Sequence, residues 1–208
     1  MAFYPVMCNV ENTVAIVVGG GRIAYRKIVG LLQAGACVTV ISPEIHVEIE
    51  KLLEEKQIIW RKKVFEARDL EFAWIVIAAT NHQEVNEQVA LATSPHQLVN
   101  VVDNPEISNF HVPAKLTRGD LIISVATGGA SPTLAKVIRD ELAVVFDDSY
   151  EGYLEFLTLS REKIKYTFLD WKTKRQLLKD ITEKSYRQSI EKQQAFLELM
   201  DAFIIKSE

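Results

Sequence analysis

The stretch VAIVVGGGRIAYRK, residues 14–27, places three consecutive glycines directly after a short apolar run. Gly19, Gly21 and Ala24 match the GxGxxG/A pattern, in which the first glycine makes a tight turn and the second lets the backbone approach a pyrophosphate. The third position is small so that helix packs on strand, and the helix N-terminus offers free N–H groups to phosphate oxygens. The stretch therefore predicts a dinucleotide-binding turn; the alternative is a glycine turn without a ligand.

The group that binds the adenosine ribose is expected at the end of the second strand, where NAD-binding domains usually present a carboxylate. Here the chain reads Ser42, Pro43, Glu44, so the carboxylate comes late. Either Glu44 or Ser42 suits the ribose hydroxyls, whereas Arg22 suits a 2′-phosphate, and the pattern favours NAD over NADP. The cofactor-binding candidates are Gly19, Gly20, Gly21, Arg22, Ile23, Ser42, Pro43, Glu44, Ala79 and Thr80.

Two other site classes are not supported. The chain lacks the GxxxxGK[ST] pattern of nucleoside triphosphate hydrolases. Its four histidines show neither i, i+4 spacing nor nearby cysteines, so no resident metal is predicted. Cys8 and Cys37 are too few and too far apart for a disulfide framework, and we expect both to be packing residues in a reducing compartment.

The elements that must position these residues alternate between strand and helix. Residues 13–18 and 37–41 are short apolar runs that flank a helical pattern at 22–33, which makes a βαβ unit. Further strands are predicted at 57–60, 74–79 and 98–102, and further helices at 45–56 and 86–92. Strands that are apolar on both faces are typical of a parallel sheet covered by helices, so we predict an α/β Rossmann-type fold.

The residue composition changes after Asp103, where a segment rich in turn-forming residues indicates a domain boundary. A strand is predicted at 121–126, followed by a glycine loop and a helix with Ser131 as N-cap and Pro132 at its first position. From residue 150 onward the pattern indicates two to four helices. The expected division is 1–113 for the NAD-binding domain, 114–147 for a dimerisation segment and 148–208 for a helical domain.

The composition and net charge limit the classes of partner that the protein is expected to bind. The 208 residues are 48% hydrophobic and carry a net charge of −4, with a pI near 5.7. An acidic total gives no long-range attraction for nucleic acid or for an anionic membrane. The first residues lack the pattern of a signal peptide, and no apolar run approaches the roughly 20 residues that span a bilayer. We therefore expect a soluble, cytoplasmic protein that binds neither nucleic acid nor membrane.

Four later segments carry further polar or glycine-rich motifs, and three of them stand at or just beyond strand ends: the four are AATN at 78–81, NVVDNPE at 100–106, FHVPA at 110–114 and SVATGGASPTLAKVIR at 124–139. Ligands of a doubly wound sheet bind beyond the carboxyl ends of its strands, so we expect these segments to converge on one crevice. Together with VVGGGRIAYRK and LLQAGACVTVISP, they make the chain resemble the precorrin-2 dehydrogenases of siroheme synthesis, including the N-terminal module of the fused siroheme synthases. The resemblance runs from about residue 3 to about residue 142.

The resemblance implies an NAD-binding domain, a dimerisation segment that contains the second glycine loop, and a helical domain that helps enclose a tetrapyrrole. It also implies a homodimer that oxidises precorrin-2 to sirohydrochlorin with NAD as hydride acceptor. Some members of this family also insert Fe(II) into sirohydrochlorin, so a bifunctional dehydrogenase and ferrochelatase is the first alternative. A short chain without the methyltransferase half favours the dehydrogenase alone. A non-catalytic NAD-sensing module and a cofactor-free dimerisation protein are the alternatives from other classes.

Asp103 occupies the family's functional aspartate in NVVD, and its place past a strand end suits a general base or an orienting carboxylate. The alternative is an aspartate that begins the Asp-Asn-Pro turn. The substrate-binding candidates are Ser124 and Thr127 for substrate carboxylates, Gly128 for backbone N–H groups, and His111, which is otherwise a packing residue. Arg118, Lys136 and Arg139 are the candidate cations for a polycarboxylate substrate.

Overall fold

The computed structural model describes residues 4–204. The chain divides into two compact units, with the boundary between Val112 and Pro113.

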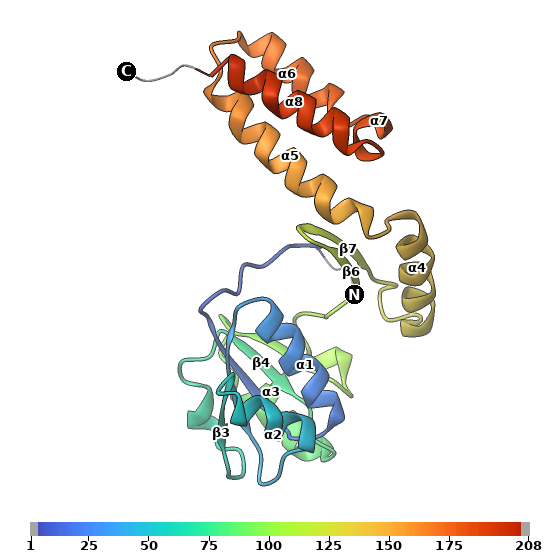
Figure 1. Cartoon of the computed structure of the whole chain (residues 1–208). Coiled ribbons are helices and arrows are strands. Elements are labelled where there is room, and N and C mark those ends of the chain that lie inside the picture. The colour runs from blue at the N-terminus through green and yellow to red at the C-terminus, as the bar shows by residue number, and fades with distance from the viewer. Residues whose placement is uncertain (1–3, 205–208) are drawn as a thin grey trace. The chain divides into compact units, whose positions relative to one another are not determined.

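The first unit is a five-stranded parallel sheet in the order β3-β2-β1-β4-β5, as expected for a Rossmann-type fold (Figure 1). Its strands are β1 (Val14–Val18), β2 (Cys37–Ile41), β3 (Ile58–Arg61), β4 (Ile75–Ala78) and β5 (Leu98–Val101). Its helices are α1 (Arg22–Gln33), α2 (Val47–Glu54) and α3 (Gln83–Ala92), with 3₁₀ turns at Ala67–Leu70 and Pro105–Ile107.

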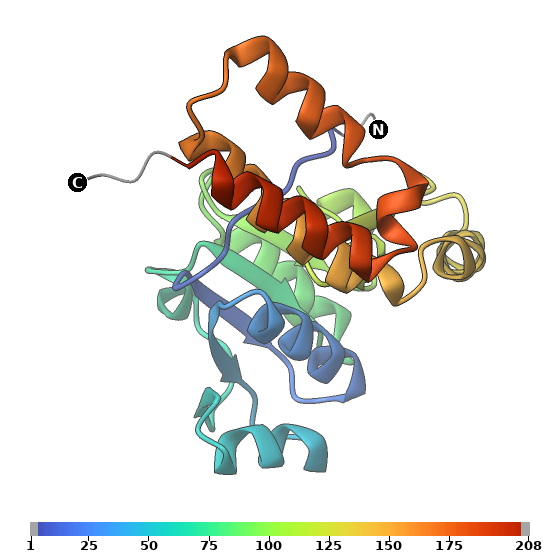
Figure 2. The same cartoon turned by 45° about the horizontal axis from the view of Figure 1, so that its top comes forward.

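Both faces of the sheet are buried, because helices cover each of them (Figures 1 and 2). Ala15 and Val17 of β1 pack in the cluster that contains α1 and α2, whereas Ile16 and Val18 pack in the cluster that contains α3. Successive strand residues point to opposite faces, so a strand buried on both faces must be apolar throughout. This explains why the sequence pattern identified the strands.

Helix α1 follows its sequence pattern at both ends. Ala24 and Ile28 lie one turn apart and are fully buried against the sheet. Gly35 has φ of 79°, and its N–H bonds to the Leu32 carbonyl while the Ala36 N–H bonds to the Leu31 carbonyl. This pair of bonds is a Schellman motif, which glycine favours because it adopts the left-handed conformation without strain.

The turn-rich crossing after β5 covers the edge of the sheet. The Val101 N–H donates to Ser108 Oγ at 2.9 Å, and the Val99 N–H donates to Asn109 Oδ1 at 2.7 Å. These side chains satisfy strand N–H groups that another strand would otherwise pair with. The crossing therefore ends the sheet at β5.

The second unit begins with an antiparallel hairpin of β6 (Ala114–Arg118) and β7 (Leu121–Val125), followed by α4 (Pro132–Val145). Strand β6 was not predicted, because its five residues alternate too briefly to stand out from the turn-rich crossing. The hairpin turn places Gly119 at φ of 54°, a value that suits glycine. Ser131 caps α4 as predicted, since its side chain accepts the Leu134 N–H at 3.1 Å.

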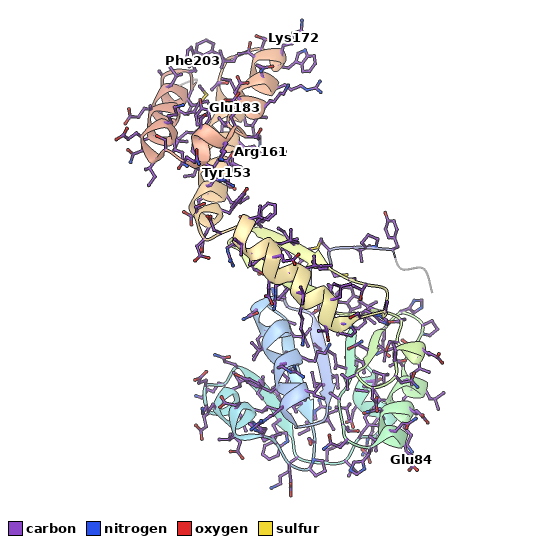
Figure 3. The ribbon with its side chains drawn as sticks, turned by 90° about the vertical axis from the view of Figure 1, so that its right-hand side faces the viewer. Glu84, Tyr153, Arg161, Lys172, Glu183 and Phe203 are labelled. Carbon is purple, nitrogen blue, oxygen red and sulfur yellow. The ribbon has the colours of Figure 1, made fainter. Side chains whose placement is uncertain are left out.

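Four helices complete the described part of the second unit, in agreement with the predicted two to four. They are α5 (Ser149–Tyr166), α6 (Trp171–Asp180), α7 (Lys184–Arg187) and α8 (Ile190–Ala202). Their core is rich in aromatic side chains, with Tyr153 of α5 (labelled in Figure 3), Phe156 and Phe196 all buried. Within residues 4–204, we find no helix that combines the length and the apolar character needed to cross a membrane.

Two expectations need correction. Cys8 and Cys37 are exposed and unpaired, so the prediction that they pack in the core is wrong. Cys37 is the first residue of β2, and burial begins only at the second residue of that strand. Helix α3 begins at Gln83 rather than at residue 86, because its first two residues, Gln83 and Glu84, are polar and exposed and give no helical signal; Figure 3 shows Glu84 projecting from the helix.

Candidate active site

The loop after β1 is held against the loop after β4. Gly19 has φ of 122°, and a Cβ there would lie 2.6 Å from the carbonyl carbon of Ala79 and closer still to its oxygen. The Gly19 N–H also donates to the Ile41 carbonyl at 2.9 Å. Gly19 is therefore required both by its backbone conformation and by the close approach of two loops.

Gly20 packs against the loop that follows β2. A Cβ on Gly20 would lie 2.8 Å from Ser42 Oγ and 3.0 Å from the Glu44 carbonyl carbon. The His46 N–H donates to the Gly20 carbonyl at 2.8 Å. The middle glycine thus joins the β1 and β2 loops, so its contacts are with protein atoms.

Gly21 differs from its two neighbours. Apart from the adjoining backbone, no atom of residues 4–204 lies within 4 Å of the position that a Cβ would take on Gly21. Gly21 is the N-cap of α1 and supplies no side-chain cap, and the first turn of α1 holds no acidic residue. Backbone N–H groups at a helix N-terminus are therefore left beside open space, which is the cradle that a pyrophosphate requires.

The first two turns of α1 carry basic side chains and no acidic one. Arg22 is exposed, and its Nε lies 3.3 Å from His46 Nε2 at the N-cap of α2. Partial burial lowers the pKa of the Lys27 ammonium, and neighbouring Arg26 lowers it further. Ile23, the other candidate in this turn, is 44% exposed. Arg22 thus points toward the start of α2.

The two ribose-binding candidates are in different situations. Ser42 is 9% exposed, and its hydroxyl donates to the Glu44 carbonyl at 2.6 Å. The Ser42 carbonyl accepts the Trp60 Nε1–H at 2.9 Å, which ties the loop to β3. Pro43 and Glu44 are exposed. The Glu44 carboxylate is therefore the more accessible of the two polar groups.

The loops after β4 and β5 are joined by one buried asparagine. Asn86 of α3 is fully buried, and its Nδ2 donates to Asp103 Oδ1 at 3.0 Å and to the Thr80 carbonyl at 3.2 Å. Its Oδ1 accepts the Thr80 N–H at 3.1 Å and the Thr80 hydroxyl at 2.8 Å. Because β1, β4 and β5 are neighbours in the sheet, the glycine loop, Thr80 and Asp103 follow one another along its carboxyl edge.

Asn86 was not among the site residues predicted from the sequence. The sequence feature that could have indicated it is its position three residues before Val89, on the same buried face of α3. A polar residue at an apolar helical position marks a buried hydrogen-bonding network.

The remaining candidates are distributed over both units. His111 is half-buried near the end of the first unit. In the second unit, Ser124 is exposed on β7, and Gly128 has φ of 61°. The Thr127 hydroxyl accepts the Ser131 N–H at 3.1 Å and donates to the Ser131 carbonyl at 3.0 Å, so it shapes the glycine loop.

The three candidate cations also lie in the second unit. Arg118 pairs with Asp148 at 3.0 Å, Arg139 pairs with Asp140 at 2.7 Å, and Lys136 is exposed. Two of the three therefore already have a carboxylate beside them. Among residues 4–204, no group of three or more His, Cys, Asp and Glu side chains is arranged to hold a metal ion.

Comparison with known proteins covers both units. An NAD(P)-binding family model matches residues 6–114, and the model of the sirohaem biosynthesis protein central region matches residues 118–144. The SirC C-terminal domain model matches residues 150–196. The precorrin-2 dehydrogenase of Priestia megaterium is 37% identical over 201 residues, which are 96% of this chain and 99% of that protein. The chain belongs to the precorrin-2 dehydrogenase family.

Other members of the precorrin-2 dehydrogenase family show the same relationship. The precorrin-2 dehydrogenase of Bacillus subtilis is 34% identical over 76% of this chain and 98% of its own length. The solved structure of SirC, a precorrin-2 dehydrogenase, aligns with 97% of this chain and all of its own at a TM-score of 0.86 and 35% identity. The siroheme synthase of Methylobacillus flagellatus is 37% identical over 87% of this chain. The aligned region makes up only 39% of that enzyme.

Proposed function

We propose that this chain is a precorrin-2 dehydrogenase, which oxidises precorrin-2 to sirohydrochlorin with NAD as the oxidant. One observation carries the proposal: the open space at Gly21 lies on the same sheet edge as the linked residues Thr80, Asn86 and Asp103. A dinucleotide cradle and a carboxylate are thereby available on one edge. The relationship to the Priestia megaterium enzyme over 96% of this chain supports the substrate.

The chain's own residues have three tasks. The backbone from Gly19 to Ile23 holds the pyrophosphate, and the exposed Glu44 carboxylate accepts hydrogen bonds from the ribose hydroxyls. NAD, when bound, supplies the hydride acceptor. Asp103 accepts the proton that leaves the macrocycle, so that one hydride and one proton account for the oxidation.

The second unit supplies the substrate contacts in this proposal. Ser124 and the Gly128 backbone bond the carboxylates of precorrin-2, and Thr127 holds the Gly128 loop in shape through Ser131. His111 is a further polar contact from the first unit. Lys136 is the cation that lacks a carboxylate partner among residues 4–204, so it is the first choice for a substrate carboxylate.

We also propose a homodimer built by residues 114–147, between a cofactor domain of 1–113 and a helical domain of 148–208. The support is a set of exposed apolar residues on α4 and β7: Ile122, Leu134, Val137, Val144 and Val145. Exposed apolar side chains on two elements that contact each other are typical of an interaction surface. Sedimentation equilibrium tests the dimer, and a monomer at micromolar concentration contradicts it.

For the cellular location we propose the cytoplasm. Its reducing environment agrees with the two unpaired cysteines, Cys8 and Cys37.

Anaerobic turnover tests the activity. Purified protein is mixed with NAD and precorrin-2, and both products are followed by their absorbance. We expect sirohydrochlorin and NADH to form in equal molar amounts. Asp103→Asn is expected to bind NAD normally and to lower kcat on the order of 100-fold, because it cannot accept the proton. NAD binding without turnover would favour the sensing module, and full activity of Asp103→Asn would remove the aspartate from the chemistry. A parallel assay with sirohydrochlorin and Fe(II) measures ferrochelatase activity separately.

A further inference from the structure

The amide of Asn86 has every hydrogen-bonding group occupied. A primary amide has two N–H donors and two acceptor lone pairs, and Asn86 uses all four on Thr80 and Asp103. A rotated amide would place its oxygen against the Thr80 carbonyl and the Asp103 carboxylate, and its N–H groups against the Thr80 N–H. These partners therefore fix the orientation of the amide.

The bond from Asn86 makes the two oxygens of Asp103 inequivalent. Oδ1 accepts the Asn86 Nδ2–H at 3.0 Å, whereas Oδ2 makes no hydrogen bond to any residue in the described range 4–204. An amide nitrogen donates but does not accept, so a proton acquired by Asp103 belongs on Oδ2. Asp103 is itself exposed, and the part-buried hydrogen bond to Oδ1 restrains its side chain.

We propose that Asn86 is a positioning residue, which holds the Asp103 carboxylate at a fixed position relative to the cofactor loop at Ala79 and Thr80. A rigid, fully buried amide on α3 links both groups, so the proton acceptor and the cofactor-binding backbone move as one. This inference rests on the proposed function, because it assigns to Asp103 the role of proton acceptor.

A purely structural role for Asn86 makes different predictions. Loss of a buried side chain would loosen α3 and affect all steps alike. A role confined to the Thr80 loop would raise the KM for NAD and leave kcat unchanged. A role through Asp103 lowers kcat, and the loss disappears once Asp103 is absent.

The experiment is a double-mutant cycle in the full chain, with Asn86→Ala, Asp103→Ala and the double variant compared for kcat, for the KM of each substrate and for NAD affinity by calorimetry. Val89→Ala is the matched control, because Val89 is also fully buried on α3 but contacts neither Thr80 nor Asp103 by a hydrogen bond. Asn86→Asp is the second variant, which keeps the shape of the side chain while replacing the Nδ2 donor to Asp103 and to the Thr80 carbonyl by an oxygen. Circular dichroism at the assay temperature checks that each variant is folded.

We expect Asn86→Ala to lower kcat about 10- to 100-fold, as is usual when a reacting group is misplaced by a fraction of an ångström to an ångström. Asn86→Asp should lower kcat by a similar factor, and in the Asp103→Ala background the further loss should stay below about twofold. Multiplicative losses in the double variant would overturn the proposal, as would an equal loss of kcat in Val89→Ala. If the unmodified protein does not turn over precorrin-2, the proposed function itself has failed, which the reaction without any variant reveals.

Discussion

The three glycines after β1 have separable tasks, and exchanging the first and third for alanine tests this. Gly19→Ala would introduce a Cβ 2.6 Å from the Ala79 carbonyl carbon, where ordinary contacts begin at 3.4 Å. Two backbone segments must then separate by close to an ångström, which costs about 1–3 kcal/mol as overpacking. The φ of 122° at Gly19 adds strain of about 1–3 kcal/mol for a residue with a side chain.

A gain on the unfolded side offsets part of this cost, since alanine restricts the unfolded chain by about 0.4–1 kcal/mol more than glycine does. The net loss in the free energy of unfolding for Gly19→Ala is therefore about 1–6 kcal/mol. Gly21→Ala has no such cost, because its φ is −87° and, apart from the adjoining backbone, no described atom lies within 4 Å of the new methyl group. Its stability should stay within about 0.5 kcal/mol of the original.

Affinity for NAD should follow the opposite order. The methyl group of Gly21→Ala occupies the open space assigned to the pyrophosphate, so the Kd for NAD should rise at least about tenfold, equivalent to about 1.4 kcal/mol. Gly21→Asp should weaken binding further, because its charge repels the phosphates.

Urea denaturation followed by tryptophan fluorescence measures the stability. The background is Trp171→Phe, so that only Trp60 and Trp74 of the first unit report. Calorimetric titration measures NAD affinity. A Gly19→Ala protein as stable as the original would refute the account of the loop contact. Unchanged NAD affinity in Gly21→Ala would refute the cofactor placement.

Three further predictions concern stability. Gln97→Leu should lower the free energy of unfolding of the first unit by about 2–3 kcal/mol, since the buried amide bonds the Leu70 and Ala73 carbonyls and the Ser94 N–H; an unchanged urea midpoint would contradict this. Ser131→Ala removes the cap of α4 in the second unit and should cost about 1 kcal/mol in a urea denaturation followed by Trp171 fluorescence in a Trp60→Phe, Trp74→Phe background, whereas a loss below error would mean that water replaces the cap. Hydrogen bonds from Thr173 and then Lys172 hold the pKa of Asp170 below its usual 3.8, so this carboxylate stabilises α6 above pH 3.8 and the benefit is lost as pH falls through the lower folded-state value. Asp170→Asn should therefore lower Tm at pH 7 and match the original at the acid end, and a pH-independent difference would show that charge is not the cause.

The local course of the first unit could be predicted from the sequence. Helix α1 and strand β2 begin and end where the pattern indicated, because apolar periodicity and glycine conformations act within a few residues. The same reasoning identified the glycine turn from Gly19 to Gly21 between β1 and α1. Strand β6 was missed, because a short alternating strand is stabilised by its partner β7 and not by its own sequence.

The contacts that assemble the site could not be predicted in this way. The bond between Asn86 and Asp103 spans 17 positions and exists because β4 and β5 are adjacent parallel strands whose carboxyl ends lie side by side. Gly20 proved to be needed by the loop at Ser42 and Glu44, since the approach of two loops depends on strand order. The sequence by itself determined the fold class and the dinucleotide turn, because both follow from steric and solvation preferences of neighbouring residues. The tertiary structure alone decided which side chain holds Asp103 and which glycine is left open to a ligand, because those depend on segments that only the folded sheet brings together.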